Sequence, residues 1–262
     1  MTVRVVLTDL DGTVLEPDGT MCLQARRAIA DLAAAGVPVC PVTSKTVSEL
    51  SAIMGRLGVA WWAGFENGAG VTCAGQGTEL VPSAVPFAKL REVFAAVRRR
   101  TGAPARSLPE IGNDELTILT GLRGDELADA RTRLATLPLV VEREWDAPLE
   151  AALPAEPRLR LLRGNRFLHL QGAHSKADVV PHLLALAAPG PGLVVACGDA
   201  PNDAELLASA DVAVIVPGEA GPHPILRQRF PEALVAPLPH GRGWAATIRE
   251  LLENEGSGAK DG

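Results

Sequence analysis

The sequence of 262 residues has few aromatic residues, few basic residues and no long apolar run, and each shortage excludes a class of protein. Tyrosine is absent and aromatic residues amount to 3%, which argues against the stacking surfaces that bind single-stranded nucleic acid. The 25 basic residues are outnumbered by 31 acidic ones, for a formal net charge of −6, so a surface that neutralises nucleic-acid phosphates is not expected. No apolar run approaches the roughly 20 residues that span a bilayer. We therefore expect neither a nucleic acid nor a membrane as a partner.

Cysteine is also scarce, and its spacing argues against a zinc site. The four cysteines form no C-x-x-C pair and have no histidine cluster nearby. They are Cys22, Cys40, Cys73 and Cys197. The N-terminus shows no apolar segment followed by a cleavage site, so we expect no signal peptide and a cytoplasmic protein with reduced thiols. A hydrophobic fraction of 47% and a charged fraction of 21% are typical of a folded globular chain.

Short apolar runs alternate with helical patterns at both ends of the chain. Near the N-terminus, the runs 3–7 and 37–42 end in polar residues, and 23–35 and 47–57 have helical spacing. The same order returns in 193–196, 202–208, 212–216 and 243–252. This alternation predicts an α/β fold: a Rossmann-like parallel sheet with helices on both faces.

The middle of the chain has a different pattern. Helical spacing covers 87–100 and 125–137, and two strand-like segments, 158–163 and 166–170, flank a Gly-Asn pair that indicates a hairpin. Because hairpins belong to antiparallel sheets, we expect an inserted α+β domain over 79–170, between core segments 1–78 and 171–262. The small and polar tail from 254 onward is expected to be disordered.

An acidic pair follows the first predicted strand. Asp9 and Asp11 stand two residues apart, and Gly12 allows a sharp turn close to a ligand. One carboxylate can attack as a nucleophile while the other transfers protons, and the pair also suits Mg²⁺. Taken alone, the same residues could form an acidic turn that caps the next element.

Three further polar clusters lie at predicted strand ends or helix starts. Thr43, Ser44 and Lys45 can form an anion site at a helix start, or only an N-cap. A lysine at a helix start opposes the helix dipole, so Lys176 suits a phosphate beside carboxylates, or it is simply solvated. The third cluster can supply carboxylate and amide oxygens to a hard cation, or cap a helix. It contains Asp199, Asn202 and Asp203.

Weaker candidates lie between these clusters. Glu66, Asn67 and Gly68 form a turn that can face a substrate, and the third glycine of a dinucleotide fingerprint is missing. Strand alternation would place Arg158 and Arg160 on one face, as a fork for a substrate carboxylate or as an ordinary solvated face.

The ordered motifs resemble the haloacid-dehalogenase superfamily of phosphoryl-transfer enzymes. They are D-x-D-G-T at 9–13, T-S-K-T at 43–46, the lone Lys176 and G-D-x-x-N-D at 198–203. The insert after the second motif resembles the cap of the subclass that includes sugar phosphatases. More narrowly, V-T-S-K-T followed by E-N-G-A is similar to mannosyl-3-phosphoglycerate phosphatases. The resemblance implies a phosphoric monoester hydrolase, monomeric or homodimeric, with a phosphorylated sugar or sugar-glycerate as substrate.

The resemblance also implies a role for each candidate residue. Asp9 would be the nucleophile and Asp11 the general acid and base. Mg²⁺ would be held by Asp9, Asp199 and the backbone carbonyl of Asp11, with Asn202 and Asp203 ordering the metal and Lys176. Phosphate would be bound by Thr43, Ser44 and Lys176. The residues expected to contact the rest of the substrate are Lys45, Glu66, Asn67, Gly68, Arg166 and His169.

The reaction implied is hydrolysis of mannosyl-3-phosphoglycerate to mannosylglycerate and phosphate, with the glucosyl compound as a second substrate. Alternatives within the superfamily are a sucrose- or trehalose-phosphate type phosphatase and a sugar phosphomutase. A phosphomutase would yield an isomerised sugar phosphate instead of free phosphate. One non-enzymatic alternative is a signalling receiver domain, which is usually much shorter. The other is a binding domain without catalytic activity, but none of the four motifs has lost a residue in a way that would support it.

Overall fold

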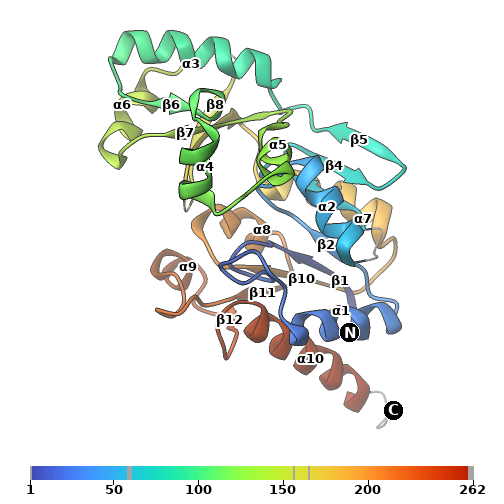
Figure 1. The fold of residues 1–262 in the computed structure, drawn as a ribbon. Coiled ribbons are helices and arrows are strands. Elements are labelled where there is room, and N and C mark those ends of the chain that lie inside the picture. Colours follow the sequence, from blue (N-terminus) through green and yellow to red (C-terminus); the bar gives the residue numbers. More distant parts are fainter. Residues whose placement is uncertain (1, 58–60, 156, 165, 259–262) are drawn as a thin grey trace.

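A five-stranded parallel sheet forms the centre of the molecule (Figure 1). The computed structural model describes residues 2–57, 61–155, 157–164 and 166–258. The sheet has the order β12-β11-β10-β1-β2, and each neighbouring pair is parallel. Its strands are β1 (Val3–Thr8), β2 (Val39–Pro41), β10 (Leu193–Gly198), β11 (Val212–Ile215) and β12 (Leu234–Val235). The predicted fold class, a parallel α/β sheet with helices, is confirmed.

Helices cover both faces of this sheet because its central strands are apolar on both sides. In β1, Val6 packs with α1, α2 and α10, whereas Val5 and Leu7 pack with α7 and α8. Such continuous apolar runs are typical of strands buried on both faces. The helices of the core are α1 (Leu23–Ala34), α2 (Val47–Leu57), α7 (Val180–Ala187), α8 (Ala204–Ala208), α9 (Pro224–Arg229) and α10 (His240–Gly258). Among the described residues, no helix has both the length and the apolarity to cross a membrane.

A second, antiparallel sheet lies within the insert. Its order is β6-β7-β9-β8, and its face toward α3 carries the alternate residues Leu168 and Leu170. The intervening residues His169 and Gln171 therefore face the other way, toward the core. The elements of this region are α3 (Phe87–Thr101), β6 (Arg106–Ser107), α4 (Asn113–Thr120), α5 (Asp125–Arg131), β7 (Thr136–Val140), α6 (Asp146–Ala151), β8 (Leu159–Arg163) and β9 (Leu168–Gly172).

A small antiparallel sheet beside the β2 edge of the core sheet was not predicted. It consists of β3 (Ala63–Phe65), β4 (Gly70–Cys73) and β5 (Gly77–Leu80). An isolated bridge joins it to the chain just after β2, between Val42 and Gly64. Strands of three or four residues are too short to show a period, and glycines at their ends weaken the strand signal further.

Three sequence predictions about the elements need correction. The helix expected over 125–137 is wrong beyond Arg131: Thr132 leaves the helical conformation and β7 begins at Thr136, where Leu137 and Leu139 occupy alternate positions and pack in the same apolar cluster. The second hairpin strand lies at Leu168–Gly172 instead of 166–170. It pairs with Leu159–Arg163 as expected, although Asn165 of the predicted turn lies outside the described residues. The tail expected to be disordered is helical as far as Gly258, and 259–262 lie outside the described residues.

Four short 3₁₀ turns complete the described structure. They are Leu108–Glu110, Arg143–Trp145, Lys176–Val179 and Pro201–Asp203. Two of them begin beside the carboxyl ends of β1 and β10, and they carry the charged groups described next.

Candidate active site

The carboxyl ends of the neighbouring strands β1 and β10 bring distant parts of the chain together. Thr8 and Cys197 are in register, so Asp9 and Asp199 leave the same edge of the sheet. Lys176 begins a 3₁₀ turn that Ser175 caps with its side chain. Its ammonium lies 2.6 Å from Asp9 Oδ1 and 2.6 Å from Asp203 Oδ1, and it is buried. Three of the sequence motifs therefore meet at one lysine.

Both carboxylate oxygens of Asp203 accept hydrogen bonds from within the protein. Its Oδ1 accepts from Lys176, and its Oδ2 accepts from the backbone N–H groups of Asp199 and Ala200, each at 3.0 Å. A Cβ atom on Gly198 would lie 2.4 Å from the Asp203 Cβ, so glycine is required where the strand meets this turn. Asp203 thus orients both Lys176 and the turn that carries Asp199.

Asp9, Asp199 and Asp203 form an acidic cluster in which one carboxylate oxygen of each residue lies within 4.8 Å of the others; Asp9 and Asp203 are buried and Asp199 is half-buried. Burial raises the pKa of Asp9 to about 7, with Asp203 and Asp11 adding to the effect of burial and Lys176 opposing it. Burial and the neighbouring carboxylates raise the pKa of Asp199 well above its ordinary value. With all three carboxyl groups ionised, the cluster would carry more negative charge than the single ammonium of Lys176 neutralises, and a bound cation would offset the excess.

This donor set fits a hard divalent cation. Thr13 donates to Asp199 Oδ1 at 3.0 Å, and within the described structure the other oxygen of Asp199 has no hydrogen bond. A Cβ atom at Gly12 would lie 2.5 Å from that oxygen, and Gly12 has φ +82°. Only glycine tolerates both the close approach and the left-handed backbone. The free oxygens of Asp9 and Asp199 are hence available as metal ligands.

The loop after β2 lies beside this cluster. Thr43 is buried, and its Oγ1 accepts from the backbone N–H of Lys45 at 3.3 Å. Its backbone carbonyl accepts from the N–H of Asn67 at 2.8 Å. Thr43 therefore shapes the loop without lining the cavity described below, which Ser44 does line.

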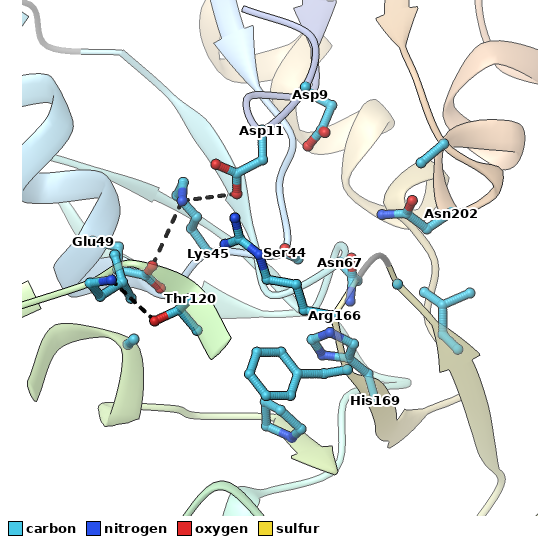
Figure 2. A pocket seen from close by; sticks show the side chains of 18 of the residues that line it. Asp9, Asp11, Ser44, Lys45, Glu49, Asn67, Thr120, Arg166, His169 and Asn202 are labelled. Atoms are coloured by element: carbon cyan, nitrogen blue, oxygen red, sulfur yellow. Dashed lines mark hydrogen bonds and ion pairs between the residues drawn. The ribbon is translucent and has the colours of Figure 1, made fainter. Parts of the chain in front are cut away.

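Lys45 forms an ion pair with the second aspartate of the first motif. Its Nζ lies 2.9 Å from Asp11 Oδ2 and 3.8 Å from Glu49 Oε1 (Figure 2). Burial alone would lower the pKa of Lys45, but Asp11 and Glu49 outweigh burial and raise it. Lys45 is thus held as a cation at the entrance to the acidic cluster.

A cavity of about 300 Å³ separates the strand ends from the insert, and a second of about 440 Å³ adjoins it. Asp11, Lys45 and Arg166 line both. Figure 2 shows Asp9 and Asp11 at one end of the first cavity, and Asn67 and His169 toward the other. The predicted site residues that line the first cavity are Asp9, Asp11, Ser44, Lys45, Asn67, Arg166, His169, Asp199 and Asn202.

Two predicted substrate residues lie elsewhere. The Glu66 carboxylate is buried and accepts from the N–H groups of Leu134 and Ala135 and from the hydroxyl of Thr136. This placement supports a role in holding the insert against the core, and not a substrate contact. Gly68 packs against the backbone of Ser175, where a Cβ atom would lie 1.9 Å from the carbonyl oxygen.

Three lining or supporting residues were missed by sequence reasoning. Arg133 donates to the carbonyl of Ser44 at 3.2 Å and lines the cavity. His240 lines it too, and its Nδ1 lies 3.0 Å from the carbonyl of Gly12. Gln171 is buried behind Asn67. None of these three residues belongs to a short sequence motif.

Arg158 and Arg160, the possible fork for a substrate carboxylate, do not line either cavity, and Arg160 lies 3.7 Å from Glu205.

His169 is a neutral group in this cavity. Burial lowers its pKa from 6.5 to about 3, and the charges of Arg133 and Arg163 contribute. The unfolded chain takes up a proton below pH 6.5, whereas the folded chain does so only near pH 3. We therefore expect wild-type stability to fall as pH decreases from 6.5 toward 3, and the His169→Asn variant to lose less stability over that window.

Chemical denaturation at a series of pH values measures this difference. His182→Asn is the matched control, because His182 lies on α7 outside the cavity, and it should keep the wild-type pH dependence. Equal pH dependence in wild type and His169→Asn would contradict a neutral buried histidine.

Comparison with known proteins agrees with this geometry. Residues 6–101 match a family described as haloacid dehalogenase-like hydrolase. The resemblance to the haloacid-dehalogenase superfamily is confirmed. The chain is also 24% identical, over 95% of its length and 97% of the relative, to a glucosyl-3-phosphoglycerate/mannosyl-3-phosphoglycerate phosphatase of Persephonella marina. Together these matches confirm the predicted enzyme class, a phosphoric monoester hydrolase.

Solved structures of haloacid dehalogenase-like proteins share the fold of this hydrolase. A haloacid dehalogenase-like hydrolase from B. subtilis superposes with a TM-score of 0.72 at 16% identity, covering 95% of this chain and 100% of that one. The subclass IIB sugar phosphatase BT4131 superposes with a TM-score of 0.71 at 16% identity, covering 95% and 98%. At this identity the similarity concerns the fold alone.

Proposed function

We propose that this hydrolase is a Mg²⁺-dependent phosphatase that releases phosphate from mannosyl-3-phosphoglycerate, and also from glucosyl-3-phosphoglycerate. One observation carries the proposal: Lys176, itself buried, bridges Asp203 and Asp9, and Asp9 lines a cavity together with Asp199. The relative from Persephonella marina supports the substrate, because its name gives both phosphoglycerate esters.

In the proposed reaction Asp9 attacks the phosphorus atom with the oxygen that Lys176 does not bind. An aspartyl-phosphate forms while the bond from phosphorus to the leaving alcohol oxygen breaks, and Asp11 gives that oxygen a proton. Asp11 then takes a proton from the water that hydrolyses the aspartyl-phosphate. Asp9 and Asp11 both line the cavity, which is consistent with these two roles.

Asp9, Asp199 and the backbone carbonyl of Asp11 would hold Mg²⁺. The ion would reduce the repulsion between the anionic nucleophile and the anionic phosphate. Asn202 and Asp203 would order this site, and the hydrogen bonds of Asp203 support that assignment. We assign the phosphate oxygens to Lys176, Ser44 and Thr43, with Thr43 acting through the loop it shapes.

The cavity also offers a cation for a second anionic group. The Arg166 side chain is exposed, lines both cavities and forms no ion pair within the described structure. A phosphoglycerate ester carries a carboxylate that an arginine can bind. We propose residues 79–170 as a cap over the core formed by 1–78 and 171–262, with Lys45, Asn67 and His169 completing the substrate site.

A phosphate-release screen tests the proposal. The panel contains mannosyl- and glucosyl-3-phosphoglycerate, sucrose and trehalose phosphates, and simple hexose phosphates, each with Mg²⁺ and with a chelator. We expect the two phosphoglycerate esters to be hydrolysed fastest, and chelation to remove the activity. An isomerised sugar phosphate without free phosphate would indicate a mutase, and undiminished turnover with the chelator would contradict the metal.

A further inference from the structure

A chain of three polar groups leads from the segment at the end of β9 to the cavity. The carbonyl oxygen of His174, which can only accept, receives a hydrogen bond from Gln171 Nε2 at 2.9 Å. This contact orients the Gln171 amide so that its Oε1 faces Asn67 and accepts from Asn67 Nδ2 at 3.2 Å. His174 is itself anchored, because its ring Nε2 lies 3.3 Å from the carbonyl of Glu66. The orientation of both side-chain amides is thus set by a backbone carbonyl.

The end of this chain is an unused acceptor. Asn67 is 1% exposed and lines the cavity, and its Oδ1 has no hydrogen-bond partner within the described structure. The residue cannot readily shift, since its φ is +59° and its N–H donates to the carbonyl of Thr43. A buried acceptor without a partner is unfavourable, and a donor on a bound molecule would satisfy it.

We propose that Asn67 Oδ1 accepts a hydrogen bond from a hydroxyl group of the leaving alcohol, and that Gln171 is the positioning residue that keeps Asn67 in this orientation. A rotated Asn67 amide would present two donors to the cavity instead of an acceptor. The substrate class follows from the chemistry: esters whose leaving alcohol carries a free hydroxyl within reach of Asn67. In the proposed substrates this is a hydroxyl of the sugar, because both hydroxyls of the glycerate part are substituted. The inference rests on the proposed phosphatase function and adds a selectivity to it.

Two esters of the same carbon skeleton test this selectivity: glycerol 3-phosphate, which has hydroxyl donors, and n-propyl phosphate, which has none. We expect wild type to prefer glycerol 3-phosphate in kcat/KM. The preference should fall roughly tenfold in Asn67→Leu and in Gln171→Met, as expected for one lost hydrogen bond. Gln76→Met, in the exposed turn between β4 and β5, should keep the preference.

A double-mutant cycle separates positioning from a general structural role. If Gln171 acts through Asn67, the double variant has a preference no lower than that of Asn67→Leu, whereas additive losses would overturn the inference. Should Gln171→Met not fold, Asn67→Asp replaces it: that variant keeps its acceptor oxygens and should keep the preference, and a loss equal to that of Asn67→Leu overturns the proposal. Equal turnover of both esters by wild type overturns the selectivity alone. No phosphate release from any ester overturns the proposed function as well.

Discussion

Replacing Asp9 by asparagine is expected to reduce phosphate release by about 10⁴-fold or more, because an amide cannot serve as the nucleophile. The variant should nevertheless be at least as stable as wild type at alkaline pH. Asp9 has a folded-state pKa of about 7 against an ordinary value of 3.8. The folded chain therefore binds more protons than the unfolded chain between these values, and the stability contributed by Asp9 falls as pH rises through this window. Asparagine has no such proton to lose.

Phosphate release with Mg²⁺ and the unfolding midpoint from pH 4 to pH 8 measure the two effects. The midpoint of Asp9→Asn minus that of wild type should increase with pH. Asp114→Asn, on the exposed start of α4, is the matched control and should change neither quantity. Near-normal turnover in Asp9→Asn would reject Asp9 as nucleophile.

Most of the core sheet could be predicted from the sequence, because its strands are buried on both faces and so appear as short apolar runs. Val5 and Leu7 on one face and Val6 on the other leave β1 no polar side. The helix expected over 125–137 failed for a related reason. From Thr136 onward the sequence also fits a strand, with Leu137 and Leu139 at alternate positions, and contacts distant in sequence decided the outcome. The residues at 134–136 bind Glu66, about 70 positions away.

The candidate site also has one part that could be predicted from the sequence and one part that could not. Asp9, Asp199 and Lys176 were predicted to meet because parallel strands place their carboxyl ends at one edge of the sheet. The opposite wall of the cavity could not be derived, since its residues belong to the insert, whose orientation no local pattern fixes. Arg133 and Gln171 act through partners 89 and 104 positions away. Glu66 was expected to face a substrate, and only the fold reveals that its carboxylate is occupied by the backbone of the insert.

Replacing Lys176 by methionine is expected to destabilise the folded chain by about 3–5 kcal/mol at pH 8, the cost of breaking a buried ion pair. Lys176 is 1% exposed, and its ammonium lies 2.6 Å from both Asp9 and Asp203. Without it, the buried carboxylates of Asp9, Asp199 and Asp203 face one another with no cation among them. Loss of the charge that we propose to bind phosphate should abolish turnover as well.

The pH dependence of the unfolding free energy shows whether Lys176→Met loses stability because the charge of the lysine is gone. Lys176 lowers the pKa of Asp9 against the larger effect of burial, so its removal lets the carboxylates take up protons at higher pH. Protonation relieves their repulsion, and the deficit of Lys176→Met in unfolding free energy should therefore be smaller at pH 5 than at pH 8. Lys89→Met is the control, because Lys89 forms an exposed pair with Glu92, for which about 0–1 kcal/mol is expected. A deficit that does not change with pH would mean that Lys176 stabilises the fold through packing and not through its charge.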